Sequence, residues 1–151
     1  MQRGWTPITD ISRYEELLAR VRALGLANHF PDVAPGNAID FNYTPHFLQG
    51  PMILQLRCQI PENELDAVMN LVATHKAEAQ NADRHVDPTA PRPYDYTADT
   101  GNVRALDSSF DMHMLYAEAH GQDAFSWNHG SYEGIAIDRA NRVMLYFASA
   151  W

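Results

Sequence analysis

The chain has 151 residues, of which 46% are hydrophobic and 20% charged, and its 19 acidic and 11 basic side chains give a formal net charge of -8. This size and composition are typical of one folded domain and exclude wholesale disorder. The negative charge argues against nucleic acid as a partner, because phosphates would be repelled. Ten of the 11 basic residues are arginine and Lys76 is the one lysine, so no Lys-rich segment is present to dock on an anionic membrane surface.

Cys58 is the one cysteine, which excludes an internal disulfide and a cysteine-based zinc cage. Residues 1–30 contain no basic start followed by an apolar run, and no stretch of the chain is long and apolar enough for a transmembrane helix. We therefore expect a cytoplasmic protein, or one whose leader or lipid anchor has been removed.

Two amphipathic helices are predicted. The first has a capping box from Ser12 to Glu15 and a stop at Gly25. Its apolar residues recur at helical spacing: Leu17, Leu18, Val21 and Leu24. The second helix begins with Pro61 at its first position and runs to about Gln80.

Five segments alternate apolar and polar residues with the period of a half-buried strand. They lie at about 39–44, 52–60, 110–116, 135–137 and 143–147. The order α-β-β-α-β-β-β lacks the strict alternation of a parallel doubly wound sheet. The sequence therefore predicts a single α+β domain over residues 1–151, with an antiparallel sheet of about five strands, two helices on one face, and a long irregular loop at about 81–108.

No motif predicts a cofactor or a metal site. The seven histidines form neither an HxH nor an HExxH pair, and the nearest ligand set is Asp111 with His113, two residues apart on a strand, joined by His129. A small hydrolase or metal-dependent enzyme built on these residues is one possible function. The simpler interpretation is a set of solvated polar groups on a sheet, because a metal site needs three or four convergent ligands.

Other candidate sites also have a simpler structural interpretation. Cys58 shares a strand face with apolar residues, which favours an inert buried thiol over a nucleophile. The segment Ser126 to Ser131 has no base at nucleophile spacing. The acidic residues of the long loop do not match a calcium-binding loop and are interpreted as a solvated acidic segment.

The remaining functional argument concerns the polar face of the sheet. If every second side chain points inward, the opposite face presents a mixed polar and aromatic surface that suits a protein interface. With the nearby tryptophan, the predicted partner-binding residues are Asp40, Asn42, Gln55, Arg57, Asp111, His113, Tyr146 and Trp127. The leading hypothesis is a non-enzymatic module that binds a basic protein, in its most specific form an immunity-type inhibitor of a toxin. A plain solvated face is the opposing interpretation, and a domain that self-associates as a homodimer through its final strand is the second alternative.

Overall fold

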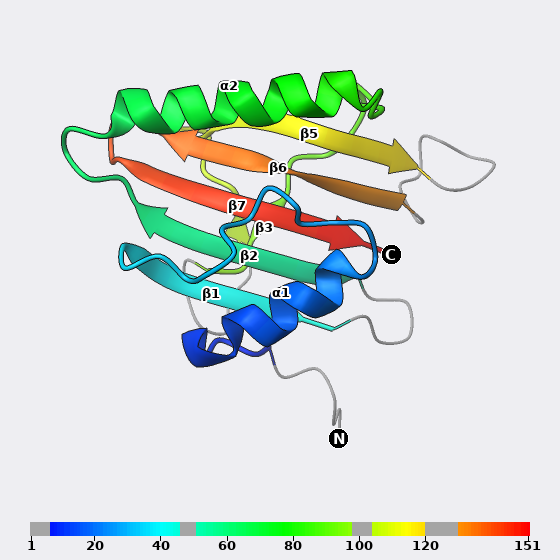
Figure 1. Ribbon diagram of the computed structural model, residues 1–151, viewed down its shortest axis with the longest axis horizontal. Helices are drawn as coiled ribbons and strands as arrows, with labels where there is room; N and C mark the ends of the chain where they lie inside the picture. Colours follow the sequence, from blue (N-terminus) through cyan, green and yellow to red (C-terminus); the bar gives the residue numbers. More distant parts are fainter. Residues whose placement is uncertain (1–6, 46–50, 98–103, 120–129) are drawn as a thin grey trace.

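The chain has an α+β fold built on a five-stranded antiparallel sheet, as the sequence predicts (Figure 1). The computed structural model describes residues 7–45, 51–97, 104–119 and 130–151. The sheet order is β1-β2-β7-β6-β5. Its strands are β1 (Ala38–Thr44), β2 (Met52–Gln59), β5 (Asp111–Ala119), β6 (Gly130–Asp138) and β7 (Val143–Ala150). β7 pairs with β2 on one side and with β6 on the other, so neither of its edges is free. The predicted route of self-association, through the final strand, is therefore wrong.

Both helices cover the same face of the sheet, α1 (Tyr14–Arg22) beside β1 and α2 (Leu65–Asn81) along β5 (Figure 1). A single 3-10 turn, η1 (Ile11–Arg13), precedes α1. The predicted capping box is wrong, because Asp10 and not Ser12 supplies the cap: its carboxylate accepts from the Ser12 N–H at 3.0 Å. Within the described residues, neither helix is long and apolar enough to cross a membrane.

The main hydrophobic core lies between the helices and the sheet. It contains the buried side chains of α1, Val72 of α2, and the linker residues Leu26 and Phe30, which cross the sheet between the two helices. Tyr14 anchors this layer, because its ring packs edge-on against Phe41 and its hydroxyl donates to the Pro31 carbonyl at 2.6 Å.

The opposite face of the sheet is also buried, beneath the segment that follows α2. Within that segment β3 (Tyr94–Asp95) pairs with β4 (Arg104–Ala105), and β3 lies behind the sheet in Figure 1. A second hydrophobic cluster is enclosed there: Leu106, Phe110, Ala117, Tyr132, Ala136, Val143, Leu145 and Phe147. The predicted long loop therefore acts as the second cover of the sheet.

Candidate functional site

The predicted polar binding face is largely sealed by the chain's own loop. Asn42 and Gln55 are 3% and 2% exposed. The Gln55 amide donates to the Tyr94 carbonyl at 2.7 Å and accepts from the Tyr96 N–H at 2.9 Å. Arg57 pairs with the buried Asp95 carboxylate. These side chains fasten the loop to the sheet, so the prediction that they stand exposed on an open face is wrong.

Tyr146 lies on the helix-covered face, not on the predicted polar face. It is 5% exposed and packs against Phe30, with ring centroids 5.5 Å apart. The predicted alternation has the wrong phase along β7, where Val143, Leu145 and Phe147 face the loop. Trp127 lies outside the described residues.

Asp111 and His113 also lie on the helix side of the sheet, at the β5 edge. The Asp111 carboxylate is exposed, with Arg139 3.8 Å away, whereas His113 is half-buried. Burial, and then the charge of Lys76 in α2, lowers the pKa of His113. His129, the third predicted ligand, is outside the described residues, and within those residues no group of three or more His, Cys, Asp or Glu side chains could hold a metal ion. Nothing in this part of the chain assembles the metal site of the alternative hypothesis.

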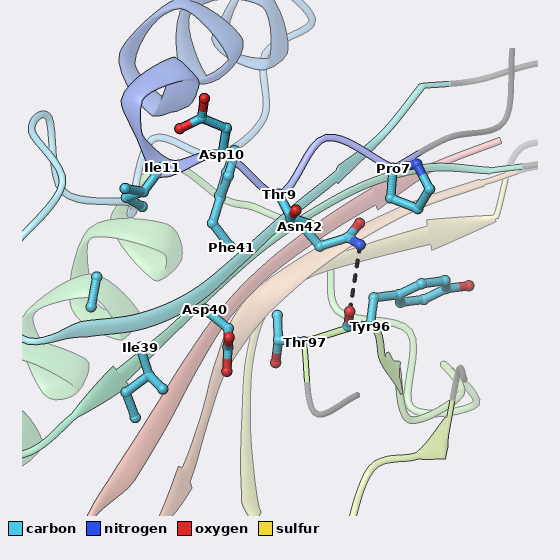
Figure 2. A pocket seen from close by; sticks show the side chains of 11 residues that line it. Pro7, Thr9, Asp10, Ile11, Ile39, Asp40, Phe41, Asn42, Tyr96 and Thr97 are labelled. Atoms are coloured by element: carbon cyan, nitrogen blue, oxygen red, sulfur yellow. Dashed lines mark hydrogen bonds between the residues drawn. The ribbon is translucent and has the colours of Figure 1, made fainter. Parts of the chain in front are cut away.

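Asp40 is exposed on β1, at the edge of the sheet, where a hollow of about 600 Å³ runs beside the strand. Figure 2 shows its two walls: Thr9 to Ile11 on one side of β1, and Tyr96 with Thr97 on the other. The Asn42 amide donates to the Tyr96 carbonyl at 3.4 Å and connects the strand to the second wall (Figure 2). We call this hollow the β1 groove.

The floor of the β1 groove is an incompletely paired strand edge. Ile8 pairs with Tyr43 through two backbone hydrogen bonds of 2.8 and 2.9 Å, after which the N-terminal segment turns away into η1. Main-chain groups of an antiparallel strand point to alternate sides, so the N–H and C=O of Phe41 face the same outer edge as those of Tyr43. No backbone group in the described part of the chain pairs with Phe41 there.

The β1 groove carries negative charge. Asp10 and Asp40 line it, and no basic side chain does so within the described residues. The pKa of Asp10 is lowered by the Ser12 hydroxyl, which donates to its carboxylate at 2.7 Å, and next by the Ser12 N–H, so this group is ionised at neutral pH. Ile39, 48% exposed at the β-bulge of β1, adds an apolar contact to the rim.

A second polar centre, which the sequence reasoning missed, is buried between the helices and β6. Glu133 is 0% exposed, accepts from the Ala27 N–H at 2.6 Å and forms an ion pair with Arg84. The guanidinium of Arg84 also lies 4.4 Å from the ring centroid of Tyr116. A sequence signal existed, because Glu133 stands two residues before Ile135 and therefore in phase with the core-facing side of its strand.

His29 completes this buried centre. Its Nε2 lies 2.9 Å from the Gly134 carbonyl, and its Nδ1 lies 3.7 Å from a Glu133 oxygen without a hydrogen-bond partner in the described part of the chain. Burial lowers the pKa of His29 to about 3, so the ring is neutral and its approach to Glu133 is not an ion pair. The adjoining cavity of about 130 Å³, lined also by His75, has room for only a few water-sized groups, and the cluster ties the linker before β1 to the end of α2.

Cys58 is buried, as predicted, at 1% exposure. Burial raises the pKa of its thiol to about 12, which leaves it protonated and unreactive at neutral pH.

No family model, no curated protein and no solved structure matches this chain.

Proposed function

We propose that this protein is a protein-binding module that takes an extended, basic segment of a partner as an additional strand along β1. The observation that carries the proposal is the β1 groove, in which a strand edge at Phe41 stands beside the Asp10 and Asp40 carboxylates. Strand addition to an open sheet edge is a recurrent mode of peptide recognition, because main-chain hydrogen bonds supply affinity while alternate side chains supply specificity.

The part of β1 that lines the groove before the Ile8 pairing, residues 38–42, would take a short segment. At about 3.3 Å per residue, five residues span roughly 17 Å. The incoming strand would lie end to end with the pairing that Ile8 already makes to Tyr43, so it would extend an existing register. Side chains on one face of the segment would then meet Asp40, and those on the other face would meet the wall of Asp10 and Ile11, so a segment that alternates basic and apolar residues can point its basic side chains at Asp40.

Charge complementarity favours a basic partner. The net charge of -8 attracts a cationic chain from a distance, and the two groove carboxylates would meet it on contact. An immunity-type inhibitor that blocks a basic toxin is the most specific form of this proposal, and a cytoplasmic site of action belongs to the same hypothesis. Both stay predictions, because they rest on size, acidity and the groove alone.

Peptide titration tests the proposal directly. The probe is a blocked hexapeptide of alternating lysine and valine, compared with a glutamate-valine peptide and with the lysine-valine peptide methylated on every backbone nitrogen. We expect only the unmethylated basic peptide to bind, with chemical-shift changes in β1. The substitution Asp40→Asn should weaken binding about threefold to fivefold, as for an exposed ion pair.

The matched control is Asp111→Asn, which removes an exposed carboxylate from the opposite edge of the sheet. It should leave the affinity of the basic peptide unchanged. Equal binding of the methylated peptide, or equal weakening by both substitutions, would show that strand addition at β1 is not the mode of binding. Dimerisation through β1, seen by sedimentation, would instead make a second copy the occupant of the groove.

A further inference from the structure

A second hollow of about 590 Å³ lies on the loop-covered side of the sheet, away from the helices. It is lined by residues of β2, β6 and β7 and by the loop that contains Tyr94. Its size falls in the range of about 300 to 1,000 Å³ that small-molecule sites occupy in proteins. We call it the aromatic pocket.

Five aromatic residues line this pocket: Tyr94, Tyr96, Tyr132, Phe147 and Trp151. Tyr132 meets Trp151 edge to face, with ring centroids 5.4 Å apart at 87°, and its ring lies 6.0 Å from that of Phe147. Burial raises the pKa of Tyr132 to about 12, so the hydroxyl is neutral and the wall carries no charge at that position. Tyr94 also lines the pocket while 57% of it remains exposed to solvent. A flat apolar ligand would cover such rings and remove their surface from water.

The charge of the aromatic pocket is opposite to that of the β1 groove. Arg92 is the one charged residue in its lining, and no carboxylate lines it within the described residues. The Arg92 side chain is held in place, because one guanidinium nitrogen donates to the carbonyls of Asp107 at 3.0 Å and Phe110 at 3.2 Å. The net charge of -8 opposes an anion at long range, but inside the pocket the one charged lining residue favours an anion over a cation.

We propose that the aromatic pocket binds a small, ring-containing apolar molecule that carries a negative charge, of the aromatic carboxylate class. The rings of Tyr94, Tyr132 and Trp151 would contact its apolar body, and Arg92 would attract its carboxylate. The aromatic pocket and the β1 groove are two different sites, because they have no lining residue in common except Tyr96.

The probe is 2-naphthoate, titrated into the full chain and followed by calorimetry and by NMR, with neutral 2-naphthamide as its isosteric control. We expect 2-naphthoate to bind more tightly, with shift changes at the aromatic pocket and none in β1. Arg92→Gln should weaken naphthoate about fivefold and leave naphthamide unchanged, while Arg92→Lys, which keeps the charge, should restore most of the affinity. Tyr94→Ala should weaken both compounds, by about tenfold, since it removes a ring that either would cover.

Arg139→Gln is the charge-matched control, because Arg139 is exposed in the turn between β6 and β7 and lies outside the pocket. Equal loss of affinity in that variant would reduce the effect to net charge and overturn the role of Arg92. The proposal is also overturned if naphthoate fails to bind at millimolar concentration, if the shifts fall elsewhere, or if Tyr94→Ala binds like the wild type. None of these outcomes depends on whether the lysine-valine peptide binds β1.

Discussion

Because His29 is buried and neutral, the free energy of unfolding is expected to depend on pH. Burial places the pKa of its folded-state ring at about 3, against an ordinary value of 6.5 that applies to the unfolded chain. Below pH 6.5 His29 binds a proton in the unfolded chain but stays neutral in the native state. The contribution of neutral His29 to the free energy of unfolding is therefore complete above pH 6.5 and is lost as the pH falls toward 3.

The size of the effect follows from proton linkage. Each pH unit inside this window costs about 1.4 kcal/mol. Between pH 7 and pH 5 the expected loss from His29 alone is about 2 kcal/mol. We expect His29→Gln to remove this contribution, because glutamine does not titrate and its amide can still donate to the Gly134 carbonyl.

Urea unfolding of the wild type and of His29→Gln at pH 7 and pH 5 measures this difference. The loss of free energy of unfolding on acidification should be smaller by about 2 kcal/mol in the variant. His85→Gln, which removes an exposed histidine, is the matched control and should keep the full pH dependence because His29 is still present. An identical pH dependence in wild type and His29→Gln would refute the reasoning.

Three further predictions concern buried contacts that hold the fold together. Arg84→Met should lower the free energy of unfolding in urea by about 3 to 5 kcal/mol, because it leaves the Glu133 carboxylate buried without its cation. Gly134→Ala should be strongly destabilising by thermal melting, because a methyl group there would stand 2.9 Å from the Phe147 ring and nearer still to a β5 carbonyl oxygen. Arg57→Gln should speed chymotryptic cleavage within 91–97 several-fold, because Arg57 binds the Asp95 carboxylate and the Thr97 hydroxyl.

Each of these has a matched control. Arg139→Met replaces an exposed arginine and should cost little, within about 0.5 kcal/mol for a surface position. Gly36→Ala adds a methyl group where no other atom lies within 4 Å, so its melting temperature should stay near that of the wild type. Arg139→Gln, at an exposed position in the turn between β6 and β7, is the control for proteolysis. An Arg84→Met protein as stable as Arg139→Met would show that the buried pair contributes nothing.

The positions of the strands could be predicted from the sequence, but their faces could not. Alternation gives a phase only where polar residues interrupt the apolar ones, as in β1 and β2. In β7 the run Val143–Met144–Leu145–Tyr146–Phe147 is apolar throughout, so either phase fits. In β5 a register shift between Met114 and Tyr116 reverses the facing of the strand partway along, and no local signal announces it.

The covering of the second sheet face by the segment after α2 could not be predicted from local sequence patterns either. A segment without periodicity is expected to be solvated, yet Leu106 and Phe110 are buried against β7 and β6. What holds the segment down is polar: Gln55 and Arg57 project from β2 and bind its backbone and its Asp95 side chain. Such pairings join residues far apart in the sequence, and composition alone cannot match them. Asp40 stays exposed beside this loop, although Asn42, two residues along the same edge strand, is buried by it.

Because both faces of the sheet are covered, the two proposed binding sites lie in hollows beside the covering loop. The loop that carries Tyr96 and Thr97 forms a wall of the β1 groove, and through Tyr94 and Tyr96 it also lines the aromatic pocket. Loosening this loop by Arg57→Gln should therefore weaken the basic peptide and naphthoate together, whereas Asp40→Asn should affect only the peptide. If Arg57→Gln accelerates cleavage of the loop but leaves both affinities intact, the two hollows do not depend on the loop for their shape, and the binding surfaces must be sought on the strands themselves.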